Sequence, residues 1–180
     1  MRQLASDLGT AQRLWGWYLA LGILMIVVGF YAIYAEGLAT LASVVALGFV
    51  LLIAGVGQIA AAFMARGAGH VILLLLVGFL DIIVGLALLQ HPTINALFIT
   101  LLLAALFLFG GAFRFVSALW LQFPNYGWVA ASGAISFILG VLLWAQWPIS
   151  AFWFIGFAVG LNFIFAGIAW SSLGLKLKAL

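Results

Sequence analysis

"GFLDIIVG", at residues 78–85, combines two glycines seven positions apart with one aspartate in an otherwise apolar stretch. Seven positions are almost two turns of an α-helix, so both glycines lie on one face of any helix that runs through this stretch. Such a face lets the backbone of a neighbouring helix approach closely. The stretch therefore predicts a tightly packed helix, and it raises the question of what holds Asp81 in so apolar a setting.

The whole chain has the composition of a protein that is embedded in lipid. Its 180 residues are 69% hydrophobic and 5% charged, and the mean hydropathy is +1.41. A soluble domain has about 25% charged residues to cover its surface. The six basic residues are scattered between apolar runs and form no basic face, which argues against a nucleic-acid partner. We therefore expect an integral membrane protein whose first partner is the lipid bilayer.

Short breaks with proline, glycine or charge divide the chain into six apolar segments. Each segment has roughly the 20 residues that a helix needs to cross a bilayer core of about 30 Å. The predicted spans are residues 15–34, 39–65, 70–89, 94–121, 126–146 and 149–173. The first span is too long for the apolar core of a signal peptide, which has about 7–15 residues. The short breaks predict antiparallel hairpins, hence an all-α bundle of six transmembrane helices in a single membrane domain, residues 1–180.

The opening stretch occurs in three related copies. "GILMIVVG" begins at residue 22 and "GAISFILG" at residue 133, with "GFLDIIVG" between them at residue 78. The second, fourth and sixth spans carry the same spacing of small residues, with Ala104 in one glycine place. A fixed period of this length, about 55 residues, indicates an internal repeat.

The period divides the chain into three repeats of two helices, at approximately residues 15–65, 70–121 and 126–174. We expect the glycine faces to point inward and Leu, Ile, Val and Phe to point outward. The predicted helix-packing glycines are Gly22, Gly29, Gly48, Gly55, Gly78, Gly85, Gly111, Gly133, Gly140, Gly160 and Gly167.

The basic residues predict the orientation of the chain. All six lie on, or close to, the side of the predicted bundle that holds the N-terminus: Arg2, Arg13, Arg66, Arg114, Lys176 and Lys178. The opposite side holds Glu36 and His91 and no Lys or Arg. Because basic loops stay in the cytoplasm, both termini are predicted to be cytoplasmic.

The repeats resemble the HdeD family of bacterial inner-membrane proteins. The resemblance rests on the paired glycines, on "QHPTINAL" at residues 90–97 and on "LFLFGGAFRFVSALW" at residues 106–120. It covers nearly the whole chain, and Glu36 departs from the proline that the family often has there. The resemblance implies three short two-helix repeats, a location in the bacterial inner membrane and an association with acid resistance.

Asp81 and Arg114 are the charged residues that fall inside predicted spans. Asp81 lies three positions after Gly78, and Arg114 lies three positions after Gly111 in the following span. At about 1.5 Å per residue, their depths in the membrane differ by roughly 6–8 Å, much of which an arginine side chain can bridge. We predict an intramembrane ion pair. Two alternatives stay open, in which Asp81 responds to proton load or is held neutral by hydrogen bonds.

The other polar residues of the spans have simpler interpretations. Gln58 and Asn162 are predicted to form hydrogen bonds between helices. The sequence has no cluster of metal ligands, no nucleophile beside a base and no phosphate-binding loop. We therefore expect no catalytic, cofactor-binding or metal-binding residues, no cofactor and no enzymatic activity.

Three functions are compatible with these observations. The first is a non-enzymatic inner-membrane protein of HdeD type that supports tolerance of acid or envelope stress. The second is an accessory or scaffolding subunit of a larger membrane complex, which the apolar surface would suit. Migration of the protein only as a small homo-oligomer, the other partner that we consider, would argue against this second function. The third is a small transporter or proton pathway through Asp81.

Overall fold

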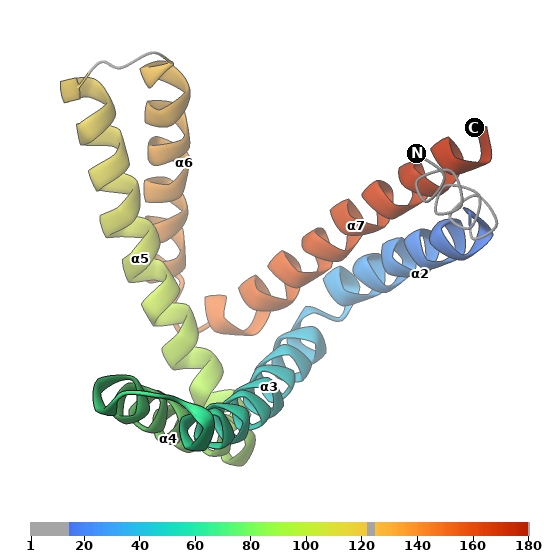
Figure 1. Ribbon diagram of the computed structural model, residues 1–180. Coiled ribbons are helices and arrows are strands. Elements are labelled where there is room, and N and C mark those ends of the chain that lie inside the picture. The colour runs from blue at the N-terminus through green and yellow to red at the C-terminus, as the bar shows by residue number, and fades with distance from the viewer. Residues whose placement is uncertain (1–14, 122–124, 180) are drawn as a thin grey trace. The chain divides into compact units, whose positions relative to one another are not determined.

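The computed structural model describes residues 15–121 and 125–179, and each element of this part is an α-helix (Figure 1). The helices are α2 (Trp15–Tyr34), α3 (Glu36–Met64), α4 (Ala68–Gln90), α5 (Pro92–Leu121), α6 (Tyr126–Ala145) and α7 (Ser150–Ala179). All six are long and apolar enough to cross a membrane. The prediction of an all-α chain with six transmembrane helices is confirmed.

The helix ends lie close to the predicted ends, and the last helix is longer than expected. Pro92 is the first residue of α5, where its missing N–H would have had no partner in the helix. The extension of α7 to Ala179 places Lys176 and Lys178 in the last turn, where cations interact favourably with the helix dipole. The predicted interfacial Arg2 and Arg13 lie outside the described residues.

Two of the connections between helices are single residues. Ala35 joins α2 to α3 and His91 joins α4 to α5. Ala35 N–H donates to Tyr31 O at 2.8 Å, and His91 N–H donates to Ala87 O at 3.2 Å. His91 itself has left the helical region, with φ −136° and ψ 65°, and Pro92 has no N–H with which to continue the ladder. Both connections are short, and the structure pairs the glycine face of each joined helix with a different helix.

The connection between α3 and α4 reverses the chain, and it has the backbone geometry of a turn. Gly67, at the start of α4, has φ 98°. Residues other than glycine rarely adopt this left-handed region. Asn125, before α6, has φ 68°, a conformation that asparagine tolerates better than most residues. Both left-handed conformations thus lie in connections between repeats.

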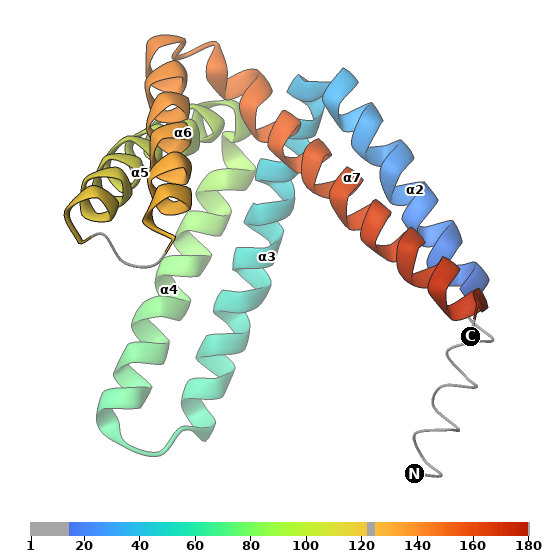
Figure 2. The ribbon, with the colours of Figure 1, turned by 90° about the horizontal axis from the view of Figure 1, so that it is seen from above.

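The structure accordingly pairs helices differently from the sequence expectation. The glycine faces join α3 to α4, α5 to α6 and α2 to α7, and Figures 1 and 2 both show these helices side by side. Each pair takes its two helices from different repeats. The predicted hairpins within repeats are replaced by hairpins between repeats, and the last helix pairs with the first.

Internal contacts divide the chain into two compact units. The first contains α2, the start of α3 up to Ala39, and α7 from Gly156. In this unit a Cβ added to Gly167 would lie 2.6 Å from Gly22 O, and one added to Gly160 would lie 2.8 Å from Gly29 O. Tyr18 also stacks on Trp170, with ring centroids 5.6 Å apart. Backbone contact thus extends along both helices.

The second unit, residues 40–155, contains the other two helix pairs. Between α3 and α4, a Cβ on Gly78 would lie 2.9 Å from Gly55 O, and one on Gly85 would lie 2.9 Å from Gly48 O. A buried cluster joins α3, α4 and α5, and it consists of Val44, Leu88 and Ala96. The prediction of a single membrane domain stays a prediction.

The pair formed by α5 and α6 repeats the same contact. A Cβ on Gly111 would lie 2.8 Å from Gly133 O, and one on Gly140 would lie 3.0 Å from Ala104 O. Ala104 is thus the small residue that faces Gly140, in the place of a glycine. All eleven predicted glycines are buried.

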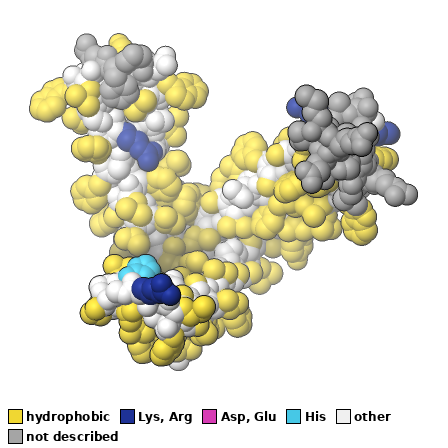
Figure 3. Space-filling view, in the orientation of Figure 1, with side chains coloured by type: hydrophobic (Ala, Val, Ile, Leu, Met, Phe, Trp, Pro, Cys, Tyr) yellow, Lys and Arg dark blue, Asp and Glu magenta, His cyan; other side chains and the backbone are white. Residues whose placement is uncertain are grey.

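Large apolar side chains cover the outer faces of these pairs. Figure 3 shows yellow hydrophobic side chains over most of the visible described surface, with isolated basic and histidine side chains. Phe109 is 77% exposed and Ile53 is 73% exposed. In water such a surface would aggregate, whereas in a bilayer it contacts lipid tails of similar polarity.

Neighbouring glycines on α5 offer a matched test of the backbone contact. The added methyl of Gly111→Ala would collide with the backbone of Phe137 and Gly133, whereas that of Gly110→Ala would meet no atom within 4 Å. We expect Gly111→Ala to destabilise the protein by about 1–3 kcal/mol through overpacking. Gly110→Ala should stabilise it by roughly 0.5–1 kcal/mol, because alanine is the better helix former. Thermal unfolding in detergent measures both. Equal midpoints for the two variants would contradict the close contact.

Candidate functional site

The most polar contact between the described helices joins Gln58 of α3 to Asp81 of α4. Each residue follows a glycine of the closest backbone contact by three positions, Gly55 in α3 and Gly78 in α4. A Cβ on Gly78 would lie 3.3 Å from the Gln58 Cβ, so the Gln58 stem crosses the glycine face. Its Nε2 then donates a hydrogen bond of 2.9 Å to Asp81 Oδ2.

This pair satisfies only part of its hydrogen-bonding capacity. Asp81 and Gln58 are both half-buried. Gln58 Oε1 is buried and has no hydrogen-bond partner among the described residues. An ionised carboxylate only accepts hydrogen bonds, whereas a protonated one also donates one. The two side chains can therefore bond in either state, with Nε2 donating to the carboxylate or the acid O–H donating to Oε1.

The predicted ion pair between Asp81 and Arg114 is not formed in this structure. The glycine face of α4 turns to α3, so Asp81 meets Gln58 instead. Arg114 belongs to the contact between α5 and α6, where its Cβ would lie 3.1 Å from a Cβ on Gly133. The guanidinium is exposed and makes no ion pair or hydrogen bond with another described residue.

Equivalent positions of the three helix pairs carry different chemistry. By the repeat period, Gln58 corresponds to Arg114 and to Trp170. Ser136 takes the place of Asp81 in α6, and its hydroxyl donates to Ser132 O within the same helix at 2.9 Å. These positions thus hold an amide and a carboxylate between α3 and α4, and a guanidinium and a hydroxyl between α5 and α6. Between α2 and α7 they hold an indole that stacks on Tyr18.

Asn162 does not bridge helices in this structure. The residue lies on α7 with its side chain exposed and makes no hydrogen bond with another described residue. Its predicted role between helices is therefore not seen within this chain.

Three buried hydroxyls escaped the sequence analysis: Thr40, Thr100 and Ser150. Thr40 Oγ1 donates to Phe152 O at 3.2 Å, and Ser150 Oγ donates to Leu143 O at 2.9 Å. Thr100 Oγ1 is buried without a hydrogen-bond partner among the described residues. Each lies in the first third of a helix that ends a repeat. This position alone does not identify them in the sequence, because Ser and Thr that face lipid would give the same pattern.

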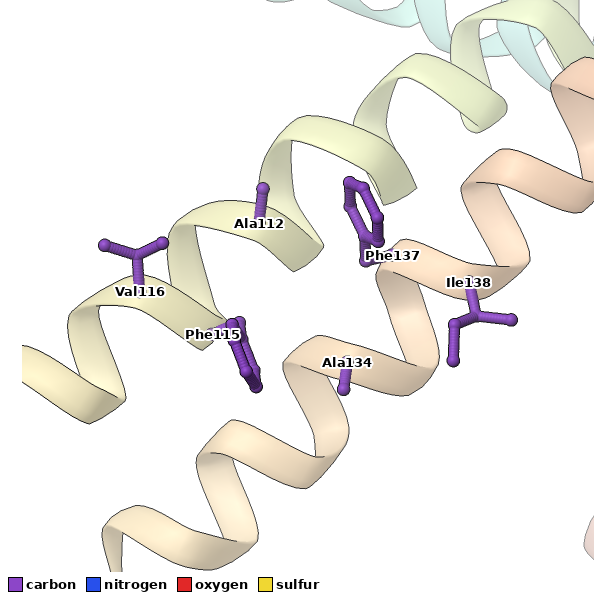
Figure 4. A pocket seen from close by; sticks show the side chains of 6 residues that line it. All are labelled: Ala112, Phe115, Val116, Ala134, Phe137 and Ile138. Atoms are coloured by element: carbon purple, nitrogen blue, oxygen red, sulfur yellow. The ribbon is translucent and has the colours of Figure 1, made fainter.

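Two grooves of similar size flank the contact between α5 and α6. The first, of about 330 Å³, is apolar, and Phe115 and Phe137 lie between the two helices there (Figure 4). The second, of about 340 Å³, we call the Arg114 groove. It is lined by Leu103, Leu106, Phe107, Gly110, Gly111, Arg114 and Ser136.

Residues 15–121 and 125–179 contain no group of three His, Cys, Asp or Glu side chains that could hold a metal ion.

Comparison with known proteins identifies a repeat family. The family described as "Short repeat of unknown function (DUF308)" matches residues 20–90 and again residues 76–145. The second match is displaced along the chain by the same period that separates the glycine-bounded copies. The period found in the sequence is thereby confirmed. No curated protein and no solved structure matches the chain.

A double-mutant cycle separates the observed partner of Asp81 from the predicted one. We expect a coupling energy of about 0.6 kcal/mol, and at most about 1.7 kcal/mol, between Asp81→Leu and Gln58→Leu, as measured for hydrogen bonds between membrane helices. Asp81→Leu and Arg114→Leu should be additive, because residues without a shared contact do not couple. Unfolding in detergent gives the free energies. Coupling to Arg114 alone would contradict the observed pairing.

Proposed function

Since the chain belongs to the family described as a short repeat of unknown function, we propose that it is a non-enzymatic protein that supports tolerance of acid or envelope stress. Its place would be the bacterial inner membrane, as the resemblance of its repeats to the HdeD family implies. The observation that carries the proposal is that the described residues lie almost wholly in six membrane-length helices with short connections. Such a chain acts inside the bilayer.

The polar contacts favour a role in membrane organisation over chemistry on a substrate. The hydrogen bond between the side chains of Gln58 and Asp81 holds α3 against α4. Where large side chains reach the surface they are mostly apolar. A protein of this kind contributes to the cell through its contacts with lipid and other membrane proteins.

We further propose that both termini face the cytoplasm. When each helix crosses the membrane once, Arg66, Lys176 and Lys178 fall on the same side as the start of α2. His91, between α4 and α5, then falls on the opposite side. The positive-inside rule assigns the basic side to the cytoplasm.

Survival of acid exposure tests the stress function. We expect a deletion strain to survive exposure less well than its parent, and the wild-type gene to restore survival at equal expression. If the pair of Gln58 and Asp81 is structural, the double variant Gln58→Leu/Asp81→Leu should also restore survival, because paired apolar residues replace a paired polar contact.

Two outcomes would redirect this proposal. Equal survival of the deletion and parent strains would count against the stress function. Failure of the folded double variant to restore survival would contradict a purely structural role of the pair. Combined with altered proton flux of Asp81→Asn in liposomes, that failure would favour the proton pathway instead.

The absence of cysteine from the sequence makes the orientation directly measurable. Arg66→Cys and His91→Cys place single thiols at exposed positions beyond opposite ends of α4. A membrane-impermeant maleimide added to intact spheroplasts should label His91→Cys, whereas Arg66→Cys should react only after lysis. The reverse pattern would place the termini outside.

A further inference from the structure

We propose that the Arg114 groove binds one anionic glycerophospholipid, with its phosphate on the Arg114 guanidinium and an acyl chain along the apolar wall. This inference goes beyond the proposed stress function and does not depend on it. Three features of the groove point to this ligand: an unpaired cation, an apolar wall, and the order in which the two lie along α5.

The first feature is the unpaired guanidinium of Arg114. Arg114 is exposed on α5, and its guanidinium has no ion pair or hydrogen bond with another described residue. A charged group without a partner in a membrane-spanning helix is costly. Arginine presents five donors in a planar fork that fits a phosphate group. A lipid phosphate would therefore supply the partner that the protein itself does not.

The depth of Arg114 suits a headgroup. Helix α5 has 30 residues, so it is about 45 Å long and exceeds a bilayer core of about 30 Å by roughly five residues at each end. Arg114 lies almost two helical turns before Leu121, the last residue of α5. Its Cα is then about 3 Å inside the core, within reach of the phosphates for a side chain that extends outward.

The wall of the groove continues from the cation toward the middle of the bilayer. Leu103, Leu106 and Phe107 line it, and Leu103 lies three helical turns before Arg114. Three turns span about 16 Å of helix, roughly the half-thickness of the core. Phe107 also makes an edge-to-face contact with Phe154, at 6.1 Å between ring centroids. The groove thus places a charge at the membrane interface and an apolar surface beneath it, which matches the headgroup and acyl chain of a phospholipid.

Gly110 keeps the groove open between these two parts. A Cβ added there would meet no atom within 4 Å, so the glycine makes no helix contact that requires it. It lines the groove beside Arg114 and Phe107. The apolar groove of the same helix pair at Phe115 and Phe137 has similar volume but no charged residue. That groove offers lipid tails a surface without a headgroup partner.

Native mass spectrometry of the delipidated protein tests the proposal. The probes are phosphatidylglycerol, phosphatidylcholine with the same acyl chains, and inorganic phosphate. We expect wild-type protein to retain one phosphatidylglycerol in preference to phosphatidylcholine. Arg114→Gln should weaken phosphatidylglycerol binding about fivefold, the effect of one basic residue beside an anionic headgroup. Arg114→Lys should keep most of the preference.

Matched variants separate a built site from general attraction. Arg66→Gln removes an exposed cation of the turn between α3 and α4 and should leave binding unchanged. Gly110→Phe keeps the cation but fills the groove, and should also lose the retained lipid. Helical content and size-exclusion profile confirm that each variant is folded. Wild-type binding by folded Arg114→Gln, an equal loss in Arg66→Gln, or displacement of the lipid by inorganic phosphate would each overturn the proposal.

Discussion

The close approach of glycine backbones is the constraint on which this structure depends. Lipid tails are as apolar as leucine, so helices in a bilayer gain little by hiding apolar side chains from it. They gain by van der Waals contact where small residues let backbones meet. A Cβ on Gly55 would lie 2.7 Å from Gly78 O, closer than real Cβ atoms approach. Each helix can satisfy this requirement along one face only, and the large apolar residues are left for the lipid.

The same backbone contact determines which groups the polar side chains can reach. A side chain three positions beyond a contact glycine lies at the edge of the helix interface, where it meets whatever the neighbouring helix presents. Gln58 meets a carboxylate and forms a hydrogen bond. Arg114 meets the small hydroxyl residue Ser136 across its groove and remains without an ion pair among the described residues. The surroundings of a polar side chain in the membrane are therefore determined by the helix that pairs with its own, and only indirectly by the type of residue.

Sequence alone predicted the helices, their period and the faces by which they pack. These features follow from hydropathy and from the seven-position spacing of glycine, both of which are local. The identity of the neighbour is not local, because every helix carries nearly the same glycine face. The prediction for Asp81 did not foresee Gln58, because the short breaks at residues 35–37 and 90–93 suggest that the two helices joined by each break also pair with each other. In the structure the glycine face of α4 meets that of α3, and Gln58 becomes the partner of Asp81 accordingly.

Pairing across repeats has a consequence for the two ends of the series. The glycine faces of α2 and α7, the first and the last of the described helices, contact each other. Gly29 and Gly160 meet there and close a loop that is about six times longer than the loop between Gly55 and Gly78. For a flexible chain, the entropy of closing the longer loop costs about 1.5 kcal/mol more. In the same pair Tyr18 stacks on Trp170, which contributes about 0.5–1.5 kcal/mol, and a lysine near the end of α7 lies over a tryptophan ring of α2, which adds about 0.5–1 kcal/mol. Contacts of this size offset the entropy of joining the first helix to the last, and they occur in the pair that no short connection holds together.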